Sequence, residues 1–268
     1  MKRIAEKVLA TAVVLVFGVA TGFASGFCGG GDWNDGGRKS VYDLRDMTIP
    51  TNGEVAVDSQ KNGGIEVIGE NRSDVRVEAC VQAWADSETE ASALVKSVNI
   101  QTDGLITAAT TGEEKNFSVS YKVHVPNDTS LRLKAHNGGL RVSGVTGNMN
   151  LETHNGGIKL SGVGGSVVGR TTNGGISISL DGAVWNGDKI NVQTTNGGVR
   201  LELPSNFAGN FELGTVNGGF SSDFEELSPA KDDSKGWKRN KKVTASLNGG
   251  GATVRAVTVN GGVKISRL

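Results

Sequence analysis

The chain has 268 residues, with 28 basic and 28 acidic residues, 40 glycines and only 4 prolines. This length allows one large domain or two small ones, and either can bury a core. The balanced charge excludes a general attraction to nucleic acid, so no nucleic-acid partner is expected. Glycine is present at about twice its usual share of roughly 7%, which indicates many tight turns, and the scarcity of proline excludes collagen and proline-rich linkers.

The N-terminal segment 1–24 is predicted to be a signal peptide. Lys2, Arg3 and Lys7 precede an uncharged, mostly apolar stretch that ends in mainly small residues at 22–26. Export to the periplasm, the cell envelope or the extracellular space is the expected consequence. The alternative is a retained membrane anchor, because residues 8–24 are close to the shortest length that spans about 30 Å of hydrocarbon. Lipidation of Cys28 is a weaker alternative, since the preceding Phe27 is bulky.

Residues 25–45 are predicted to be a flexible, glycine-rich spacer with little apolar periodicity. The only two cysteines are Cys28 and Cys80. In an oxidising compartment they would close a loop of about 50 residues, which contributes about 4 kcal/mol in the chain-entropy model. The alternative is a free, buried Cys80 on a strand and an unpaired Cys28. No spacing motif decides between the two.

Residues 46–126 are predicted to be a β-rich entry section with one helix. Apolar residues alternate with polar ones from Val75 to Ala83 and from Phe117 to Val125, as half-buried strands require, and Pro126 ends the second run. Between them, Ser87 and Glu90 form a capping-box pattern, and apolar residues follow at helical spacing. The helix is expected at about 87–98.

Residues 127–268 are repetitive. The triplet Asn-Gly-Gly begins at Asn62, Asn137, Asn155, Asn173, Asn196, Asn217, Asn248 and Asn260. From Asn137 to Asn217 the intervals are 18 to 23 residues, and a polar insertion at 221–242 lengthens the next one. Such a short period indicates a stacked repeat architecture.

Aligned on the asparagine, the repeats share columns of similar residues. The residue two positions earlier is Ala, Ser or Thr, the residues three and five positions later are mainly apolar, and the columns between them are mostly polar. Each unit of about 18–21 residues therefore predicts strand, glycine turn and strand, stacked about 4.8 Å apart in a β-solenoid or β-roll. The alternative is a chain of antiparallel hairpins joined at Asn-Gly turns. Recurrence by column favours the solenoid.

The repeat asparagines are predicted to be structural turn residues. They share the inward parity of the preceding strand, so they are expected to bond amide to amide along the stack while the glycines adopt positive φ at the corner. The threonines two positions earlier have the same inward parity and are interpreted as small core residues. The set is Asn137, Asn155, Asn173, Asn196, Asn217, Asn248 and Asn260.

The stretch from Tyr121 to Pro126, then Leu131 to Leu133 and the Asn-Gly-Gly units from Asn137 onward, resembles the bacterial "putative adhesin" family of uncharacterised β-strand-repeat proteins. The resemblance covers roughly residues 46–268. It implies an exported or membrane-tethered envelope protein built of repeated strands. It supplies no catalytic residues to transfer, so it supports architecture and compartment only.

Catalytic and metal-binding patterns are weak. His136 and His154 would stack one coil apart on the outside, but no cysteine or carboxylate column completes a metal site. Glu152, Glu202 and Glu212 fall in different columns, whereas polysaccharide cleavage needs paired carboxylates on one face. No phosphate loop or nucleophile elbow is present either. No catalytic residue, metal or cofactor is therefore predicted, although a carbohydrate-active enzyme stays the enzymatic alternative.

The second half of the polar insertion groups basic residues around one tryptophan. It could dock on an anionic envelope polysaccharide or on lipid head groups, with each cation contributing about 1 kcal/mol. The alternative is an ordinary solvated loop. The residues concerned are Lys235, Trp237, Lys238, Arg239, Lys241 and Lys242.

These observations predict a non-enzymatic, exported envelope protein that acts as an adhesin-like scaffold or interaction surface. The expected partners are an envelope polysaccharide, an anionic lipid or another envelope protein. Besides the enzyme, a membrane-tethered sensory or regulatory ectodomain remains as an alternative, and it requires that residues 8–24 are retained.

Overall fold

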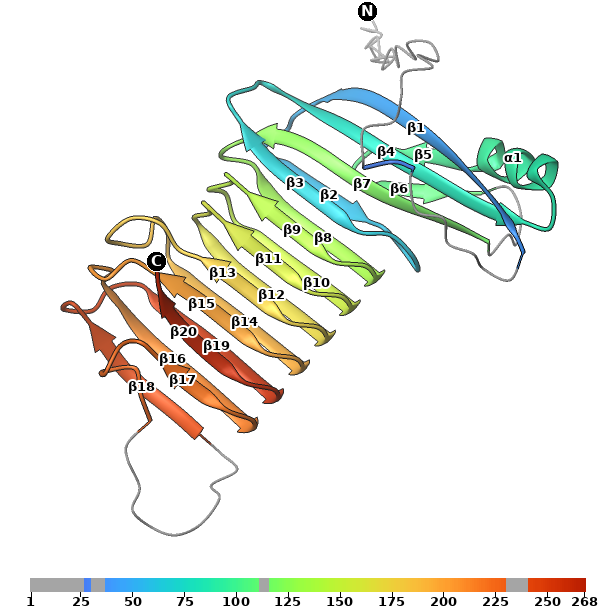
Figure 1. The fold of residues 1–268 in the computed structure, drawn as a ribbon. Coiled ribbons are helices and arrows are strands. Elements are labelled where there is room, and N and C mark those ends of the chain that lie inside the picture. The colour runs from blue at the N-terminus through green and yellow to red at the C-terminus, as the bar shows by residue number, and fades with distance from the viewer. Residues whose placement is uncertain (1–26, 30–36, 111–115, 230–240) are drawn as a thin grey trace, which may run out of the picture.

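The computed structural model describes residues 27–29, 37–110, 116–229 and 241–268. These residues form two ten-stranded sheets and one helix (Figure 1). The predicted all-β class is confirmed, and the fold is solenoid-like. The signal peptide predicted for 1–24 lies outside the described residues, as does most of the basic half of the insertion.

The two sheets, named A and B here, lie face to face. In spatial order, sheet A consists of β1 (Lys39–Pro50), β4 (Asp74–Ala85), β7 (Phe117–Pro126), β3 (Ile65–Glu70), β9 (Leu140–Ser143), β11 (Ile158–Ser161), β13 (Ile176–Ser179), β15 (Val199–Leu203), β20 (Val263–Arg267) and β17 (Phe220–Ser222). Sheet B consists of β18 (Lys241–Leu247), β16 (Gly209–Asn217), β19 (Thr253–Asn260), β14 (Lys189–Asn196), β12 (Ser166–Asn173), β10 (Met149–Asn155), β8 (Ser130–Asn137), β2 (Glu54–Asp58), β6 (Ile106–Ala109) and β5 (Asn99–Gln101).

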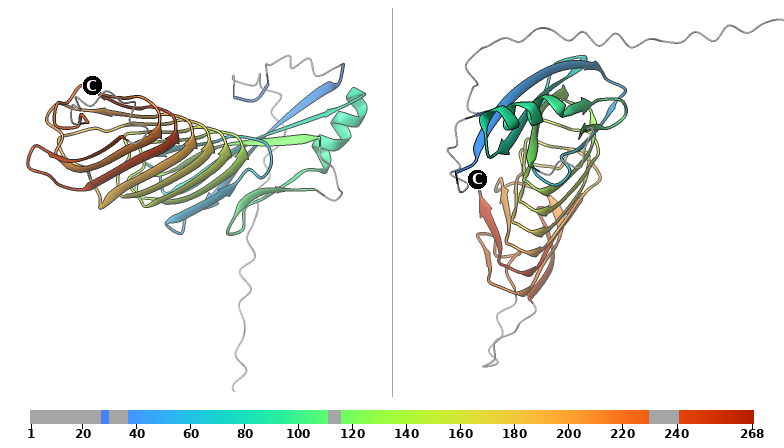
Figure 2. Two further views of the ribbon diagram at one scale, coloured as in Figure 1. Left: turned by 90° about the horizontal axis from the view of Figure 1, so that it is seen from below. Right: turned by 90° about the vertical axis from the view of Figure 1, so that its right-hand side faces the viewer.

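Each coil of the stack contains one strand of sheet B, an Asn-Gly-Gly corner and one strand of sheet A. Neighbouring coils pair in parallel and in register: β10 lies between β8 and β12, and β11 lies between β9 and β13. Figure 2 shows the stack from two further sides, with the C-terminus at the end opposite to α1. Because these pairs are parallel, the alternative of antiparallel hairpins is wrong for the coils.

The entry section continues the same sheets. Strand β2 pairs with β8, and β3 pairs with β9, so the first coil of the repeats stacks directly on residues 54–70. Beyond β3, sheet A is extended by β7, β4 and β1, of which β4 and β1 are antiparallel to their neighbours. Helix α1 (Glu88–Ser97) packs on β1 and β4, and the Ser87 hydroxyl accepts its first bond from the Glu90 amide at 3.2 Å.

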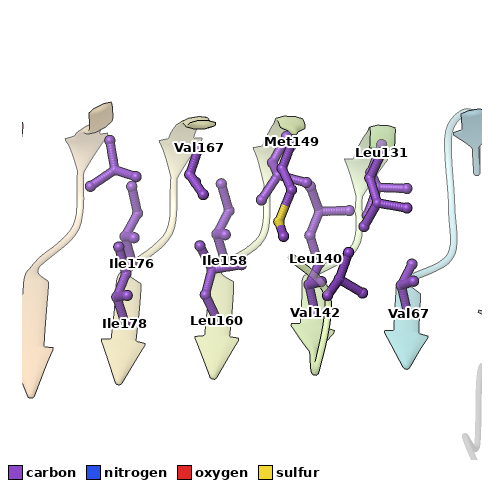
Figure 3. Packing of buried hydrophobic residues seen from close by; sticks show 14 of the residues in the cluster. Val67, Leu131, Leu140, Val142, Met149, Ile158, Leu160, Val167, Ile176 and Ile178 are labelled. Atoms are coloured by element: carbon purple, nitrogen blue, oxygen red, sulfur yellow. The ribbon is translucent and has the colours of Figure 1, made fainter. Parts of the chain in front are cut away.

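The core is the layer between the sheets. Apolar side chains repeat on successive strands of sheet A, with Leu140, Ile158 and Ile176 in one column, each at most 2% exposed (Figure 3). The strands of sheet B supply Leu131, Met149 and Val167 from the opposite side. Each coil is too short to bury these side chains alone, so the core exists only because the coils stack.

The corner asparagines form one unbroken ladder, named the Asn row here. Each amide nitrogen donates to the amide oxygen of the previous member at 2.7 to 3.0 Å, through six bonds. The side chains of the repeat asparagines are exposed, so the expected inward orientation is wrong, because the strand ends here and the chain turns toward sheet A. In spatial order, the Asn row contains Asn62, Asn137, Asn155, Asn173, Asn196, Asn260 and Asn217.

The first glycine of each repeat triplet is required by close packing. The expected positive φ is absent at Gly138, Gly156 and the equivalent glycines of later coils in the row. Instead, a Cβ placed on Gly156 would lie 2.1 Å from the carbonyl oxygen of Gly138, and similar distances of 1.8 to 2.1 Å recur along the stack. Only a residue without a Cβ lets the backbones approach this closely.

The same glycine carbonyls receive buried threonine hydroxyls. Thr153 donates to Gly138 at 2.7 Å, and Thr171 donates to Gly156 at 2.7 Å. The pattern continues in the next three coils through Thr194, Thr258 and Thr215. All five threonines are at most 5% exposed, so the bond satisfies a hydroxyl and a carbonyl that would otherwise be buried without partners.

The coils do not stack in chain order at the C-terminal end. Strands β19 and β20 insert between the coil of Asn196 and the coil of Asn217, so the last coil lies inside the stack. Strand β18 covers the end by pairing antiparallel with β16. Asn248 follows β18 and lies outside the Asn row: it has a φ of 48°, and its amide donates to the Phe207 carbonyl at 2.8 Å.

The spacer predicted for 25–45 extends too far. Strand β1 begins at Lys39 and pairs along its whole length with β4, and Val41 and Met47 pack against the core. The polar residues of this stretch hide the alternation, because β1 is an edge strand with only one apolar face.

We predict that Gly156→Ala destabilises the protein by about 3 kcal/mol, at the upper end of the cost of overpacking, because the new methyl group meets a backbone carbonyl that cannot move aside. Gly219→Ala is the matched control, since a Cβ there meets nothing within 4 Å. Urea unfolding of both variants measures the difference. Equal unfolding free energies for the two variants would contradict close packing at the corner.

Candidate binding surface

The outer face of sheet A carries three straight rows of residues, one residue of each row per strand. The second-glycine row consists of the second glycine of each triplet and runs from Gly64 to Gly219. The basic row contains Arg141, Lys159, Ser177, Arg200 and Lys264. The serine row contains Ser143, Ser161, Ser179, Glu202 and Ser266. Parallel, in-register pairing makes these rows straight, since equivalent residues of adjacent strands lie about 4.8 Å apart.

A groove of about 1190 Å³ follows the first two rows along the stack. Its floor is the second-glycine row, where no side chain fills the space, and the basic row forms one side. Phe27 lies at the end nearest β7, where the Lys122 ammonium is 4.8 Å from the centre of its ring. Phe220 lines the other end. The groove, named the sheet A groove here, thus has an open floor, a cationic side and an aromatic ring at each end.

The cations of the basic row are largely uncompensated. Arg141 has a weak ion pair with Glu66, with 3.7 Å between Nη1 and Oε1. Lys159, Arg200 and Lys264 are exposed and have no ion pair within the described part of the chain. Glu202 is the only carboxylate of the serine row between β9 and β20. The sheet A groove therefore has a positive field although the chain as a whole is neutral.

A second groove, of about 1490 Å³, lies on the outer face of sheet B. Its side chains are mixed in charge, with Lys134, Glu152 and Arg170 in register on neighbouring strands. His136 and His154 line it and stack with 4.8 Å between ring centres and 7° between their planes. Farther along, the position of the histidines is taken by Thr172, Thr195, Val259 and Val216, so this face changes from polar to apolar along the stack.

A charged network lies at the α1 end of sheet A. His124 Nδ1 is 2.7 Å from Glu70 Oε1, and Arg76 pairs with Asp46 at 2.6 Å and Glu78 at 2.8 Å. The hydrogen bond with His124 holds the pKa of Glu70 below its ordinary value. Because the groups pair with one another across β1, β4, β7 and β3, the network is best explained as a clamp between strands.

The predicted chemistry residues stay apart in the structure. Glu152 lies on β10, Glu202 on β15 of the other sheet, and Glu212 on β16, where it is 3.9 Å from Arg255. Over the described residues, no group of three or more His, Cys, Asp or Glu side chains is placed to hold a metal ion.

Cys28 and Cys80 form a disulfide, with 5.3 Å between their Cα atoms. Of the two alternatives for the cysteines, the structure has the bonded one. Cys80 lies on β4, so the bond holds residues 27–29 at the end of the sheet A groove and places Phe27 there.

The predicted anionic contact in the insertion is only partly described. Lys235, Trp237, Lys238 and Arg239 lie outside the described residues. Lys241 and Lys242 belong to β18, and the Lys241 ammonium donates to the Gly218 carbonyl at 3.3 Å.

The sheet A groove was not identified from the sequence, although its signal was present. The column four residues after each asparagine holds Arg141, Lys159, Ser177 and Arg200, and it predicted only solvent exposure. Lys264 joins the row because β20 inserts next to β15, which the order of the repeats along the chain does not reveal.

Parallel coils, a shared asparagine corner and grooved outer faces define a β-solenoid-like repeat protein. The chain belongs to the Toastrack DUF4097 family, whose model matches residues 47–266. This confirms the family resemblance of the repeats. No curated protein matches the sequence.

Two solved structures illustrate the breadth of the likeness. A "putative cell adhesion protein" from Clostridium sporogenes is 10% identical, with a TM-score of 0.47, and the alignment covers 86% of this chain and 100% of that one. A "putative adhesin" from Bacteroides fragilis is also 10% identical, with a TM-score of 0.32 and coverage of 85% and 97%. Neither likeness is close enough to assign a function.

Among the residues that the structure describes, none of the helical segments has the length and apolar character needed to cross a membrane.

We predict that Glu70 makes stability sensitive to acid. Its pKa is lowered in the folded state, so its contribution is present above the ordinary value of 4.5 and is lost as the pH falls through the folded value. Glu70→Gln should therefore show a smaller fall in melting temperature than the parent protein between about pH 6 and pH 3. Glu152→Gln on sheet B serves as the control. Parallel melting curves for Glu70→Gln and the parent would rule out this role.

Proposed function

We propose that the protein is an exported, non-enzymatic protein of the cell envelope whose outer sheet faces act as an adhesin-like interaction surface. The observation that carries this proposal is the straight, in-register arrangement of exposed side chains along two continuous grooves. A ligand with a repeating structure meets the same chemical group on each coil, and many weak contacts then add up to strong binding.

The disulfide supports export. Disulfides form and persist in oxidising compartments outside the cytoplasm and are rare within it. The bond between Cys28 and Cys80 lies a few residues after the segment 1–24, whose basic start and apolar run are typical of a signal peptide. The disulfide also needs no partner chain, so it fits a protein that folds after transport.

The distribution of reactive groups supports a binding role. Acid–base hydrolysis of a glycosidic bond needs two carboxyl groups on either side of the bond. Glu152 and Glu202 lie on different sheets, and Glu212 is next to Arg255. In place of a converging site, the described faces offer long rows of the same residue type, which suit attachment better than bond cleavage.

We predict that the protein, expressed at native level in a cell that exports it, is found outside the cytoplasm with its two cysteines oxidised. Purified protein lacking residues 1–24 should also sediment with isolated cell envelopes. Fractionation, non-reducing mass spectrometry and co-sedimentation measure these properties. A cytoplasmic location with both thiols free, or no sedimentation with envelopes, would contradict the proposal.

A further inference from the structure

We propose that the sheet A groove binds a linear acidic polysaccharide, lying along the stack with its anionic groups on the basic row. The inference deepens the proposed function, because it names the ligand of one face of the interaction surface. Three properties of the groove carry it: the spacing of its cations, its open floor and its aromatic ends.

The spacing of the cations fits a polymer. Arg141, Lys159, Ser177, Arg200 and Lys264 occupy five adjacent strands. At about 4.8 Å per strand, the row is about 19 Å long, and four of its five positions are cationic. One sugar ring advances a chain by a length similar to one strand spacing, so a polymer with one acidic group per sugar can place an anion near each cation. A single small anion would use only one position.

The open floor fits an extended chain that lies close to the backbone. The glycines of the floor are Gly64, Gly139, Gly157, Gly175, Gly198, Gly262 and Gly219. Close packing does not demand all of them: a Cβ on Gly219 would meet nothing within 4 Å, and those on Gly139 and Gly175 would lie 3.3 and 3.4 Å from a carbonyl oxygen. Their side chains would nevertheless project over the floor. With glycine at every position, the groove stays continuous from Phe27 to Phe220.

The aromatic ends and the concave shape favour a sugar polymer over a lipid surface. Aromatic rings contact the apolar faces of sugar rings well, and Phe27 and Phe220 are placed for this at the two ends of the row. A planar bilayer contacts ridges and not the floor of a groove. The basic row also lacks the exposed large apolar residues that would enter a membrane, since those of the described chain lie elsewhere, at Leu44, Leu105, Val184, Val216, Val259 and Leu268.

The test measures binding of polygalacturonate to the full mature chain by calorimetry at low salt. We expect Lys159→Gln/Arg200→Gln/Lys264→Gln to lower the affinity about tenfold or more, since three of the four cations are removed, and we expect binding to weaken with salt. The matched control is Lys134→Gln/Arg170→Gln/Lys189→Gln on the outer face of sheet B, which removes the same charge and should change the affinity less than about twofold.

A gain-of-function variant avoids any loss of folding. Ser177→Lys fills the one neutral position of the basic row and should raise the affinity severalfold, whereas Thr195→Lys on sheet B should not. Galacturonic acid as a monomer and a neutral dextran are the ligand controls, and both should bind far more weakly than the polymer.

Several results would overturn the inference: no binding of polygalacturonate, equal loss in the two triple variants, equal binding of dextran, or binding to phosphatidylglycerol vesicles in place of the polymer. If the protein sediments with envelopes but fails to bind polygalacturonate, the ligand assignment fails and the proposed interaction role stands. If it does neither and stays in the cytoplasm, both fail.

Discussion

The structure depends on the close approach of backbones at the Asn-Gly-Gly corner. The first glycine of one coil lies against the first glycine of the next, at a distance that excludes any side chain. This contact allows the amides of the Asn row to bond in sequence and brings each buried threonine hydroxyl to a glycine carbonyl. A single geometric constraint, the absence of one carbon atom per coil, thus fixes the register of both sheets.

The fixed register determines what the surface offers. Because every coil has the same phase, each position of the repeat becomes a row on an outer face, and a modest bias in composition becomes a continuous chemical feature. Arginine and lysine in one position give a line of positive charge, and glycine two positions earlier gives an open floor beside it. A neutral chain can therefore present a strongly polarised face, which global composition conceals.

Much of the fold could be predicted from the repeats, because alternation of Leu140 and Val142 or of Thr153 and Leu151 reports directly which side chains enter the core. The glycine conformation could not, since a glycine needed for positive φ and one needed for close contact look the same in a sequence. The place of Asn248 and the insertion of β19 and β20 depend on contacts between distant segments, as does the choice of a disulfide for Cys28. The basic row was visible as a column, but its continuity required the spatial order of the coils.

The order of the coils is the most direct test of this account. In the structure, Lys264 is the in-register neighbour of Arg200, and Ser221 lies one strand farther away, next to Lys264. A disulfide needs Cα atoms less than about 7 Å apart, so adjacent strands allow it and next-but-one strands do not. Under mild oxidation, Arg200→Cys/Lys264→Cys should cross-link, as peptide mapping by mass spectrometry would show, and Arg200→Cys/Ser221→Cys should not. Cross-linking of the second pair instead of the first would mean that the coils stack in chain order, and the register described here would be wrong.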